Sequence, residues 1–329
     1  MHANIDQISI SVRGRTVSVP CLRVGDLSIV KTGKFLKTAT VHDQEWQADP
    51  GIHDPIAVIE ELARTQFRVD IFSFSQTVSE AAPHYSYPME WDNAAVVKLT
   101  DFNAWWEALP QESRKNVRRG EKRGVVARST PFDDALVAGI KGLYDETPTR
   151  QGRAFWHYGK PLDIVKAENA TYLNRSEFVG AYLGNELIGF IKMVYTGKAA
   201  RIMQILSKNA HADKRPPNIL LAKAIEVCCQ RGMEYFIYGQ YYYGKKGHTP
   251  ITEFKRRNGF ECLQIPRYNV PLTVKGRVSV ALGLHKGIKE ILPGRISRFL
   301  LDARGRYYAR KSQKCLVHSE SSAPLKIEG

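Results

Sequence analysis

Residues 178–194 read FVGAYLGNELIGFIKMV and form the clearest stretch of structure in the chain. Two apolar segments, 178–183 and 187–194, flank Gly184 and Asn185. This pair tolerates positive φ angles and therefore favours a tight hairpin. The stretch predicts two antiparallel strands, and residues 201–206 predict a third strand that follows them.

The elements after this hairpin continue an α/β pattern. Pro216 and Pro217 suit the first turn of a helix, and the apolar residues that follow recur at near-helical spacing as far as Gly232. Thr249 is suited to cap a second helix, which an Asn-Gly pair ends. The predicted order is a helix at 219–230, a strand at 235–238, the helix after Thr249, and a last pair of strands at 260–264 and 268–270.

The chain before the hairpin also alternates strands and helices. Short β-branched stretches separated by Gly-containing turns predict an antiparallel meander near the N-terminus. Asp54 and Pro55 supply a cap and a first-turn proline for a helix that precedes another strand. The expected elements are strands at 8–12, 16–19, 27–30, 69–74 and 94–99, a short helix after Asp101, a basic helix at 113–124, a strand at 125–128 and a helix at 132–146.

The composition restricts the class of protein and its partners. A chain of 329 residues with 43% hydrophobic content can bury the core of one large domain or of two ordinary ones. Its 48 Lys and Arg against 33 Asp and Glu give a formal charge of +15, which favours anionic partners such as phosphorylated carriers, nucleic acid or acidic lipid. The five cysteines are odd in number and lack a CxxC pair, which fits a reducing cytoplasm better than a disulfide framework.

The sequence shows neither the pattern of a secretory signal nor that of a membrane-spanning helix. The first twenty residues alternate polar and apolar side chains, unlike a secretory signal. No apolar run approaches the roughly 20 residues that span a bilayer. We therefore expect no transmembrane segment, and a cytoplasmic protein that can contact the inner membrane face peripherally.

Three segments carry a resemblance to a known family: SRKNVRRGEKRGV at 113–125, LYDETPTRQGR at 143–153 and FKRRNGF at 254–260. Together with the order of elements, they resemble the GNAT superfamily of acyltransferases. The nearest part of that superfamily is the FemAB-like branch of peptidyl and aminoacyl transferases, with related GNAT proteins of bacterial polysaccharide clusters. The resemblance covers about residues 94–272.

The resemblance implies an α/β (α+β) fold in which helices flank a mixed, mostly antiparallel central sheet. We expect a degenerate N-terminal GNAT-like half and a complete C-terminal GNAT domain. The expected divisions are 1–110 for the N-terminal half, 111–272 for the acyltransferase domain, 273–314 for a basic helical tail and 315–329 for a disordered C-terminus.

The resemblance also implies N-acyl transfer. The donor would be acyl-CoA or aminoacyl-tRNA, without a metal, and the acceptor would be an amine of a cell-envelope or polysaccharide precursor. Attack of the amine on the donor carbonyl produces a tetrahedral oxyanion, which backbone N–H groups can stabilise where the central strands splay. A side chain of suitable pKa removes the proton from the amine.

Two positions depart from the common GNAT pattern. A glycine-rich turn usually cradles the pyrophosphate of coenzyme A, but residues 211–218 read HADKRPPN, and the two prolines remove N–H donors that such a cradle would use. Lys214 and Arg215 can still meet a phosphate by charge. The tyrosine that often acts as general acid is replaced in this register by Lys255, as FemAB-like proteins also tend to have.

The candidate site residues follow from these segments and from the end of the strand at 235–238. Lys255, Glu146 and Tyr238 are the catalytic candidates. Those for binding substrate are Arg150, Gln240, Tyr241, Tyr243 and Arg256, and those for binding the donor are Lys214, Arg215 and Asn218.

Several candidates have an alternative, and Asp145 offers the same carboxyl group as Glu146 for the role of general base. Lys255 and Arg256 would otherwise form the solvated face of a short helix, and Arg150 would pair with Asp145 or Glu146. About half of the tyrosines would serve packing, and Asn218 would start its helix. His157 is more consistent with a structural role, because no partner is visible in the sequence. No spacing of His, Cys and acidic residues suggests a metal site.

The tail from Lys275 to Lys314 contains eleven Lys and Arg residues but only two acidic residues. Interleaved apolar residues predict interfacial helices, broken at Pro293-Gly294, that suit acidic lipid, an anionic or lipid-linked substrate, or tRNA. The alternative is that these helices pack on the catalytic domain. A second function therefore stays open, that of a catalytically degenerate GNAT-like scaffold that binds membrane or nucleic acid through the tail.

Overall fold

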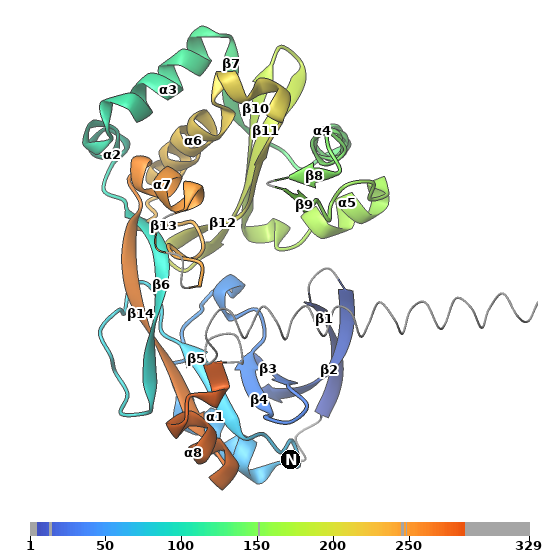
Figure 1. Ribbon diagram of the computed structural model, residues 1–329, viewed down its shortest axis with the longest axis vertical. Coiled ribbons are helices and arrows are strands. Elements are labelled where there is room, and N and C mark those ends of the chain that lie inside the picture. The colour runs from blue at the N-terminus through green and yellow to red at the C-terminus, as the bar shows by residue number, and fades with distance from the viewer. Residues whose placement is uncertain (1–4, 13–14, 151, 245–246, 248, 287–329) are drawn as a thin grey trace, which may run out of the picture.

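The structure is a computed structural model that describes residues 5–12, 15–150, 152–244, 247 and 249–286. Within them, one twelve-stranded sheet has the order β1-β2-β3-β4-β5-β14-β6-β13-β12-β11-β10-β7 (Figure 1). A small separate sheet pairs β8 (Thr149–Arg150) with β9 (Arg153–Ala154). The mixed, mostly antiparallel sheet flanked by helices confirms the predicted fold class. No helix in the described ranges is long and apolar enough to cross a membrane.

The N-terminal half begins with the predicted antiparallel meander of three strands, to which the structure adds an unpredicted fourth, β4 (Thr38–Val41). Helix α1 (Pro55–Arg64) then leads to a strand that runs parallel to the last strand of the meander. The Asp54 carboxylate accepts a hydrogen bond from the Ala57 N–H and caps this helix, as expected. The strands of this half are β1 (Ile5–Val12), β2 (Arg15–Val24), β3 (Leu27–Thr32), β4 (Thr38–Val41) and β5 (Ile71–Ser75).

The C-terminal half repeats this arrangement with a larger sheet. The predicted hairpin joins β10 (Ser176–Leu183) to β11 (Glu186–Thr196), with Gly184 at a φ of +58°. Helix α6 (Pro216–Gln230) then connects two parallel strands, β12 (Ala199–Ser207) and β13 (Tyr235–Ile237), in the way that α1 connects β4 and β5. The remaining strand, β7 (Val125–Thr130), pairs with β10 at the edge.

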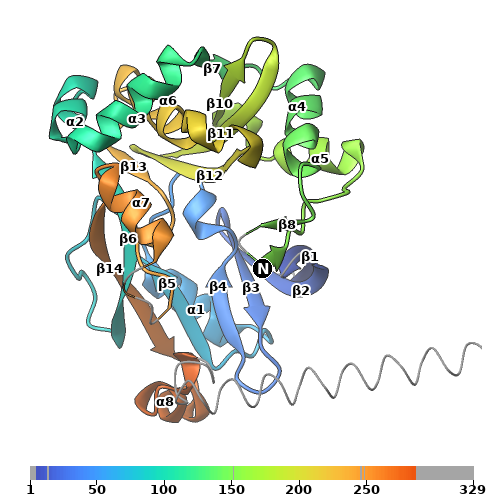
Figure 2. The ribbon, with the colours of Figure 1, turned by 45° about the horizontal axis from the view of Figure 1, so that its top comes forward.

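Two strands are exchanged between the halves. Strand β6 (Met89–Lys98) follows β5 in the sequence but pairs with β13, whereas β14 (Glu261–Pro271) follows β13 but pairs with both β6 and β5. The two strands run side by side and join the halves into one sheet (Figures 1 and 2). Both were predicted too short. The expected pair of strands at 260–264 and 268–270 is wrong, because β14 keeps its ladder through Pro266, first with β6 and then with β5.

Helices cover both faces of the larger half (Figure 2). Val117 of α3 packs with α6 on one face, and Val165 of α5 packs with α4 on the other. Helix α5 was not predicted, because its eight residues leave Leu162 and Ile164 exposed and so lack a clear apolar stripe. The remaining helices are α2 (Phe102–Ala108), α3 (Gln111–Lys122), α4 (Asp134–Tyr144), α5 (Leu162–Asn169), α7 (Pro250–Arg257) and α8 (Val274–Ala281).

Only the first part of the predicted tail is described. Helix α8 packs on the N-terminal half so closely that a methyl group on Gly276 would collide with the Asp70 carbonyl oxygen. The Lys275 amine lies 3.2 Å from the Asp70 carboxylate. The rest of the expected basic tail and the expected disordered C-terminus, residues 287–329, lie outside the described residues. The domain divisions at 110 and 272 stay predictions.

Candidate active site

Lys255 is the leading catalytic candidate, and its side chain is fully buried. It lies in α7, a helix that Thr249 caps by accepting a hydrogen bond from the Thr252 N–H. The Lys255 amine donates hydrogen bonds to the Gln240 carbonyl oxygen at 2.5 Å and to the Tyr243 hydroxyl at 3.3 Å. The structure therefore brings a predicted catalytic residue together with two predicted substrate-binding residues.

Aromatic rings enclose the Lys255 amine. It lies 4.5 Å from the centre of the Tyr238 ring and 4.7 Å from that of Tyr243, in cation–π contact with both. Burial removes water from the amine and lowers its pKa from 10.5 to about 8. No carboxylate among the described residues forms an ion pair with it. A lysine in this environment can change its protonation state near neutral pH.

The group defined by Lys255, Tyr238, Gln240 and Tyr243, which we call the Lys255 group, lies where the sheet opens. Strand β13 pairs with β12 only from Ala199 to Arg201, and Tyr238 and Gln240 follow directly where β13 ends. Side chains that follow a strand at such an opening can reach a ligand that lies between the diverging strands. The Lys255 group is therefore beside the point where β12 and β13 stop pairing.

Tyr241 and Arg256 were also predicted to bind substrate, but the structure directs them elsewhere. Tyr241 is buried in the hydrophobic core, with its ring edge against Tyr242. The Arg256 guanidinium is exposed and makes two hydrogen bonds to the Glu253 carboxylate, which Arg257 shares. Neither side chain contacts the Lys255 amine in the described structure, and their roles in binding stay predictions.

Glu146 and Arg150 form an ion pair, here called the clamp, beside Ser207 at the C-terminal end of β12. Their side chains are both 16% exposed and lie 2.8 Å apart. Arg150 also donates to the Ser207 carbonyl oxygen, and Glu146 accepts from the Ala210 N–H. This is the pairing considered as the structural alternative for Arg150. No contact in the described chain joins this pair to the Lys255 group, so a catalytic role for Glu146 and a substrate role for Arg150 stay predictions.

The predicted donor-binding residues lie around the start of α6. Arg215 adopts a left-handed conformation with φ of 54° before Pro216, and Asn218 is buried and donates to the Asn258 side chain at 3.0 Å. The segment before α6 packs against α3: a methyl group on Gly120 would meet the Lys214 carbonyl oxygen, and Arg123 bonds to Asp213. Asn218 therefore joins α6 to α7, while Arg215 stays exposed.

His157 is buried beside Tyr144 and Trp156, with ring centres 4.2 and 3.6 Å away. Burial, and then the charge of Lys160, lower its pKa to about 4. Its ring nitrogen lies 3.3 Å from the Gln204 amide. The imidazole is therefore neutral at physiological pH, which agrees with the structural reading of this residue.

Sequence reasoning missed two residues, Arg201 and Glu45. The Arg201 guanidinium lies 3.7 Å from the Glu45 carboxylate, which comes from the short 3-10 turn Gln44–Trp46 of the N-terminal half. Burial, followed by the charge of Glu45, raises the pKa of Tyr243, so Glu45 is within electrostatic reach of the Lys255 group. The sequence could have drawn attention to Arg201, because it is the one charged residue in the apolar strand β12. No local sequence pattern distinguishes Glu45 from other surface carboxylates.

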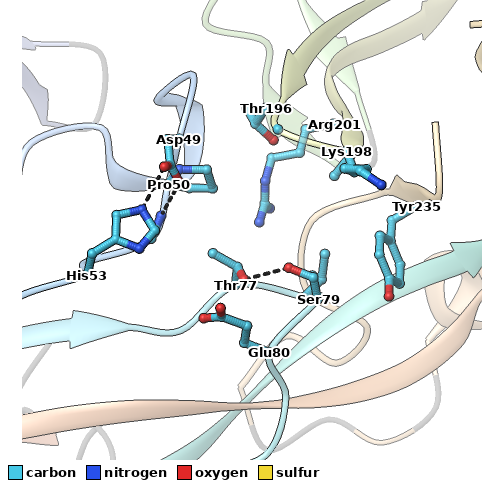
Figure 3. Close-up of a pocket in the computed structure, with 14 residues that line it drawn as sticks. Asp49, Pro50, His53, Thr77, Ser79, Glu80, Thr196, Lys198, Arg201 and Tyr235 are labelled. Atoms are coloured by element: carbon cyan, nitrogen blue, oxygen red, sulfur yellow. Dashed lines mark hydrogen bonds and ion pairs between the residues drawn. The ribbon is translucent and has the colours of Figure 1, made fainter. Parts of the chain in front are cut away.

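A cavity of about 180 Å³ lies between the two halves beside Arg201 (Figure 3). Loops 49–53 and 77–80 of the N-terminal half form one side, and the β11–β12 turn with Tyr235 forms the other. None of the predicted site residues lines it. No cluster of His, Cys, Asp and Glu suited to a metal ion occurs in the described ranges.

Proteins similar to this chain occur among solved structures. No protein-family model matches the chain, and no curated protein matches it in sequence. The C-terminal domain of a putative lysylphosphatidylglycerol synthetase from Agrobacterium fabrum is 13% identical, with 84% of this chain and 87% of that chain covered and a TM-score of 0.51. L-PGS from Bacillus licheniformis is 12% identical, with 79% and 86% covered and a TM-score of 0.50. A FemX structure is 11% identical, with 85% and 90% covered and a TM-score of 0.47.

These likenesses show the fold. The chain has a GNAT-like α/β fold, which it shares with the first two of these structures, and its two halves form one sheet. The resemblance inferred from the three sequence segments is confirmed at the level of fold.

Proposed function

We propose that the chain transfers an acyl or aminoacyl group to an amine of a cell-envelope or polysaccharide precursor, with Lys255 as the group that moves the proton. The observation that carries the proposal is the fully buried Lys255 amine at the opening of the sheet. Its pKa of about 8 makes the neutral form accessible at mildly alkaline pH, which suits a proton acceptor.

In the proposed reaction, the acceptor nitrogen attacks the carbonyl carbon of the donor ester. A C–N bond forms, and neutral Lys255 takes one proton from the attacking nitrogen. The tetrahedral intermediate then breaks the C–O bond of an aminoacyl ester, or the C–S bond of a thioester, and the proton passes to the leaving atom. Tyr243 and the Gln240 carbonyl oxygen hold the amine in place for both transfers.

The oxyanion of that intermediate needs hydrogen-bond donors that are already in position. The backbone N–H groups of Gly239 and Gln240 donate to no acceptor in the described part of the chain. They directly follow the end of β13, and the Gln240 carbonyl oxygen contacts Lys255. We propose that these two N–H groups donate hydrogen bonds to the oxyanion.

Among donors, we favour an aminoacyl ester over coenzyme A. The two prolines at the start of α6 lack N–H donors, and α3 packs against the segment where a pyrophosphate cradle would lie. Helix α3 also exposes a row of basic residues that suits a polyanion such as tRNA. These exposed residues are Lys115, Arg118, Arg119, Lys122 and Arg123.

The acceptor is proposed on chemistry and on likeness of fold. One similar structure is described as the C-terminal domain of a putative lysylphosphatidylglycerol synthetase, which supports a lysyl group as the transferred group to test, with an amine-bearing precursor of the cell envelope as acceptor. The formal charge of +15 suits an anionic or lipid-linked acceptor and peripheral contact with the inner membrane face. A cytoplasmic location is part of this proposal.

The first experiment compares donors and variants. Thermal unfolding of the purified chain is measured with acetyl-CoA, longer acyl-CoAs and lysyl-tRNA, because a ligand at about 100 times its Kd adds about 2.7 kcal/mol of stability. Transfer of a labelled acyl or lysyl group to a membrane-lipid and precursor extract is measured in parallel. Lysyl-tRNA is expected to stabilise the chain and to support transfer.

Lys255→Ala is expected to reduce transfer by about 100-fold or more while the chain stays folded. The matched control is Lys166→Ala, which removes a lysine that is 55% exposed and pairs with Asp134 on the surface. Equal transfer by the two variants would refute the role of Lys255. Stabilisation by none of the donors would contradict the transferase proposal, and stabilisation by a CoA ester alone would contradict the preference for an aminoacyl donor.

A further inference from the structure

The cavity between the two halves is built from segments far apart in the sequence. The Gly197 N–H in the β11–β12 turn donates to the Ala48 carbonyl oxygen at 2.6 Å, which holds that turn against the loop that continues to His53. The 77–80 loop closes the opposite side, where the Thr77 and Ser79 hydroxyls bond to each other at 2.9 Å. In Figure 3, the Arg201 side chain extends from β12 into the space between these loops.

Arg201 is a charged group without a hydrogen-bond partner in the described structure. Its side chain is 14% exposed, and its Nε atom is buried and unbonded. The nearest carboxylate belongs to Glu45, which is 58% exposed and lies 3.7 Å away, beyond hydrogen-bond distance. A guanidinium stays charged in proteins, so burying it without acceptors costs free energy that an anion would recover.

A second polar group in the same cavity also lacks a partner. The Thr196 hydroxyl is buried and bonds to no atom of the described residues, although its residue lines the cavity with Arg201. Buried polar atoms are nearly always hydrogen-bonded, and an exception calls for a specific explanation, such as an ordered water or a bound ion. One oxyanion with two oxygens can accept hydrogen bonds from Arg201 and from Thr196.

The outer rim of the cavity contains two carboxylates, besides Lys198, whose amine pairs with Glu234. Asp49 and Glu80 line it, both are exposed, and Asp49 pairs with His53 at 2.7 Å. The hydrogen bond from His53 is the main cause that lowers the pKa of Asp49, which therefore carries a negative charge at neutral pH. A ligand that fits both ends has an anionic group inside and a cationic group at the rim.

We propose that this cavity binds a small zwitterion of the α-amino-acid type. Its carboxylate bonds to Arg201 and Thr196, and its ammonium group faces Asp49 and Glu80. A volume of about 180 Å³ is enough for one amino acid. A phosphate dianion would be repelled by the two rim carboxylates, and a diamine would be repelled by Arg201. The site is separate from the Lys255 group and is tested by binding alone.

The test measures binding to the full chain by calorimetry and thermal unfolding. The probes are glycine, L-alanine and L-lysine, with acetate, 1,5-diaminopentane and inorganic phosphate for comparison. At least one amino acid is expected to bind more tightly than acetate, which has only the anionic end. Binding of none of the amino acids, or tighter binding of phosphate, overturns the proposal.

Two variants locate the site. Arg201→Met is expected to weaken amino-acid binding by about 30-fold or more, because it removes a buried charged partner. Its melting temperature without ligand should match or exceed that of the wild type, because the variant no longer buries a charged group that lacks hydrogen bonds. Thr196→Val keeps the shape of the side chain and should weaken binding by about fivefold or more.

Lys198→Met is the matched control. It also lines the cavity, but its side chain is 71% exposed and its amine pairs with Glu234. This variant should bind the amino acid like the wild type, and so should Lys255→Ala, which separates this site from the proposed transfer reaction. Unchanged binding by both Arg201→Met and Thr196→Val would refute the assignment.

Discussion

Replacing Lys255 with methionine should change how the stability of the chain depends on pH. The pKa of Lys255 is about 8 in the folded state and 10.5 in an exposed lysine. Below about pH 8 the Lys255 amine is protonated in both the folded and the unfolded chain. Desolvation of this charge then destabilises the folded state by its full amount, about 3 kcal/mol. As pH rises from 8 to 10.5, only the unfolded state stays protonated, so this destabilisation is progressively lost.

The size of the effect follows from the two pKa values. Between about pH 7 and about pH 9.5 the wild type should gain about 2 kcal/mol of unfolding free energy relative to Lys255→Met. The variant loses hydrogen bonds to Gln240 and Tyr243, which together contribute about 2 kcal/mol at any pH. The variant should therefore be the more stable protein near neutral pH, and this advantage should disappear in alkaline solution.

Urea unfolding of both proteins, followed by tryptophan fluorescence at several pH values, measures this difference. Lys166→Met is measured alongside, because it removes a lysine that is 55% exposed and so reports the loss of a hydrated charge. Equal m-values are required for the comparison, since a changed slope indicates an altered denatured state. A difference between wild type and Lys255→Met that stays constant with pH would refute the buried, pKa-shifted lysine.

Three further substitutions test how the structure is held together. Arg150→Met should destabilise the fold by about 3 kcal/mol, because it leaves the Glu146 carboxylate buried without its partner; a loss under about 1 kcal/mol in urea unfolding would contradict the clamp. Gly120→Ala should cost about 2 kcal/mol by pushing α3 away from Ile219, and an unchanged melting temperature would argue against that close approach. Lys192→Met should change the stability little near pH 7, because the three hydrogen bonds from the buried Lys192 amine to residues 169 and 171 are offset by the desolvation that lowers its pKa from 10.5 to about 8. Above about pH 10 the variant should be less stable by about 2 kcal/mol, and equal stability there would show that those oxygens find other donors.

The sequence alone determined the local elements and one part of the candidate site. The hairpin at 178–194, the caps at Asp54 and Thr249, and the helix that starts at Pro216 depend on residues within a few positions of one another. The resemblance of the FKRRNGF segment to FemAB-like proteins also singled out Lys255, which takes the place of the usual general-acid tyrosine in this register. Such features can be predicted from the sequence because hydrophobic periodicity, turn residues and helix caps depend only on residues close to one another in the chain.

Only the tertiary structure decided which distant residues meet. The exchange of β6 and β14 depends on pairing between strands more than 160 residues apart, which no local period encodes. Contacts between segments that are similarly distant in the sequence place Glu45 beside Arg201 and enclose a cavity between the two halves. Glu146 and Arg150 are near in sequence, yet their engagement with the end of β12 depends on how α4 packs on the sheet. Burial and pairing of these side chains arise only when the chain folds, because tertiary contacts between distant segments create both.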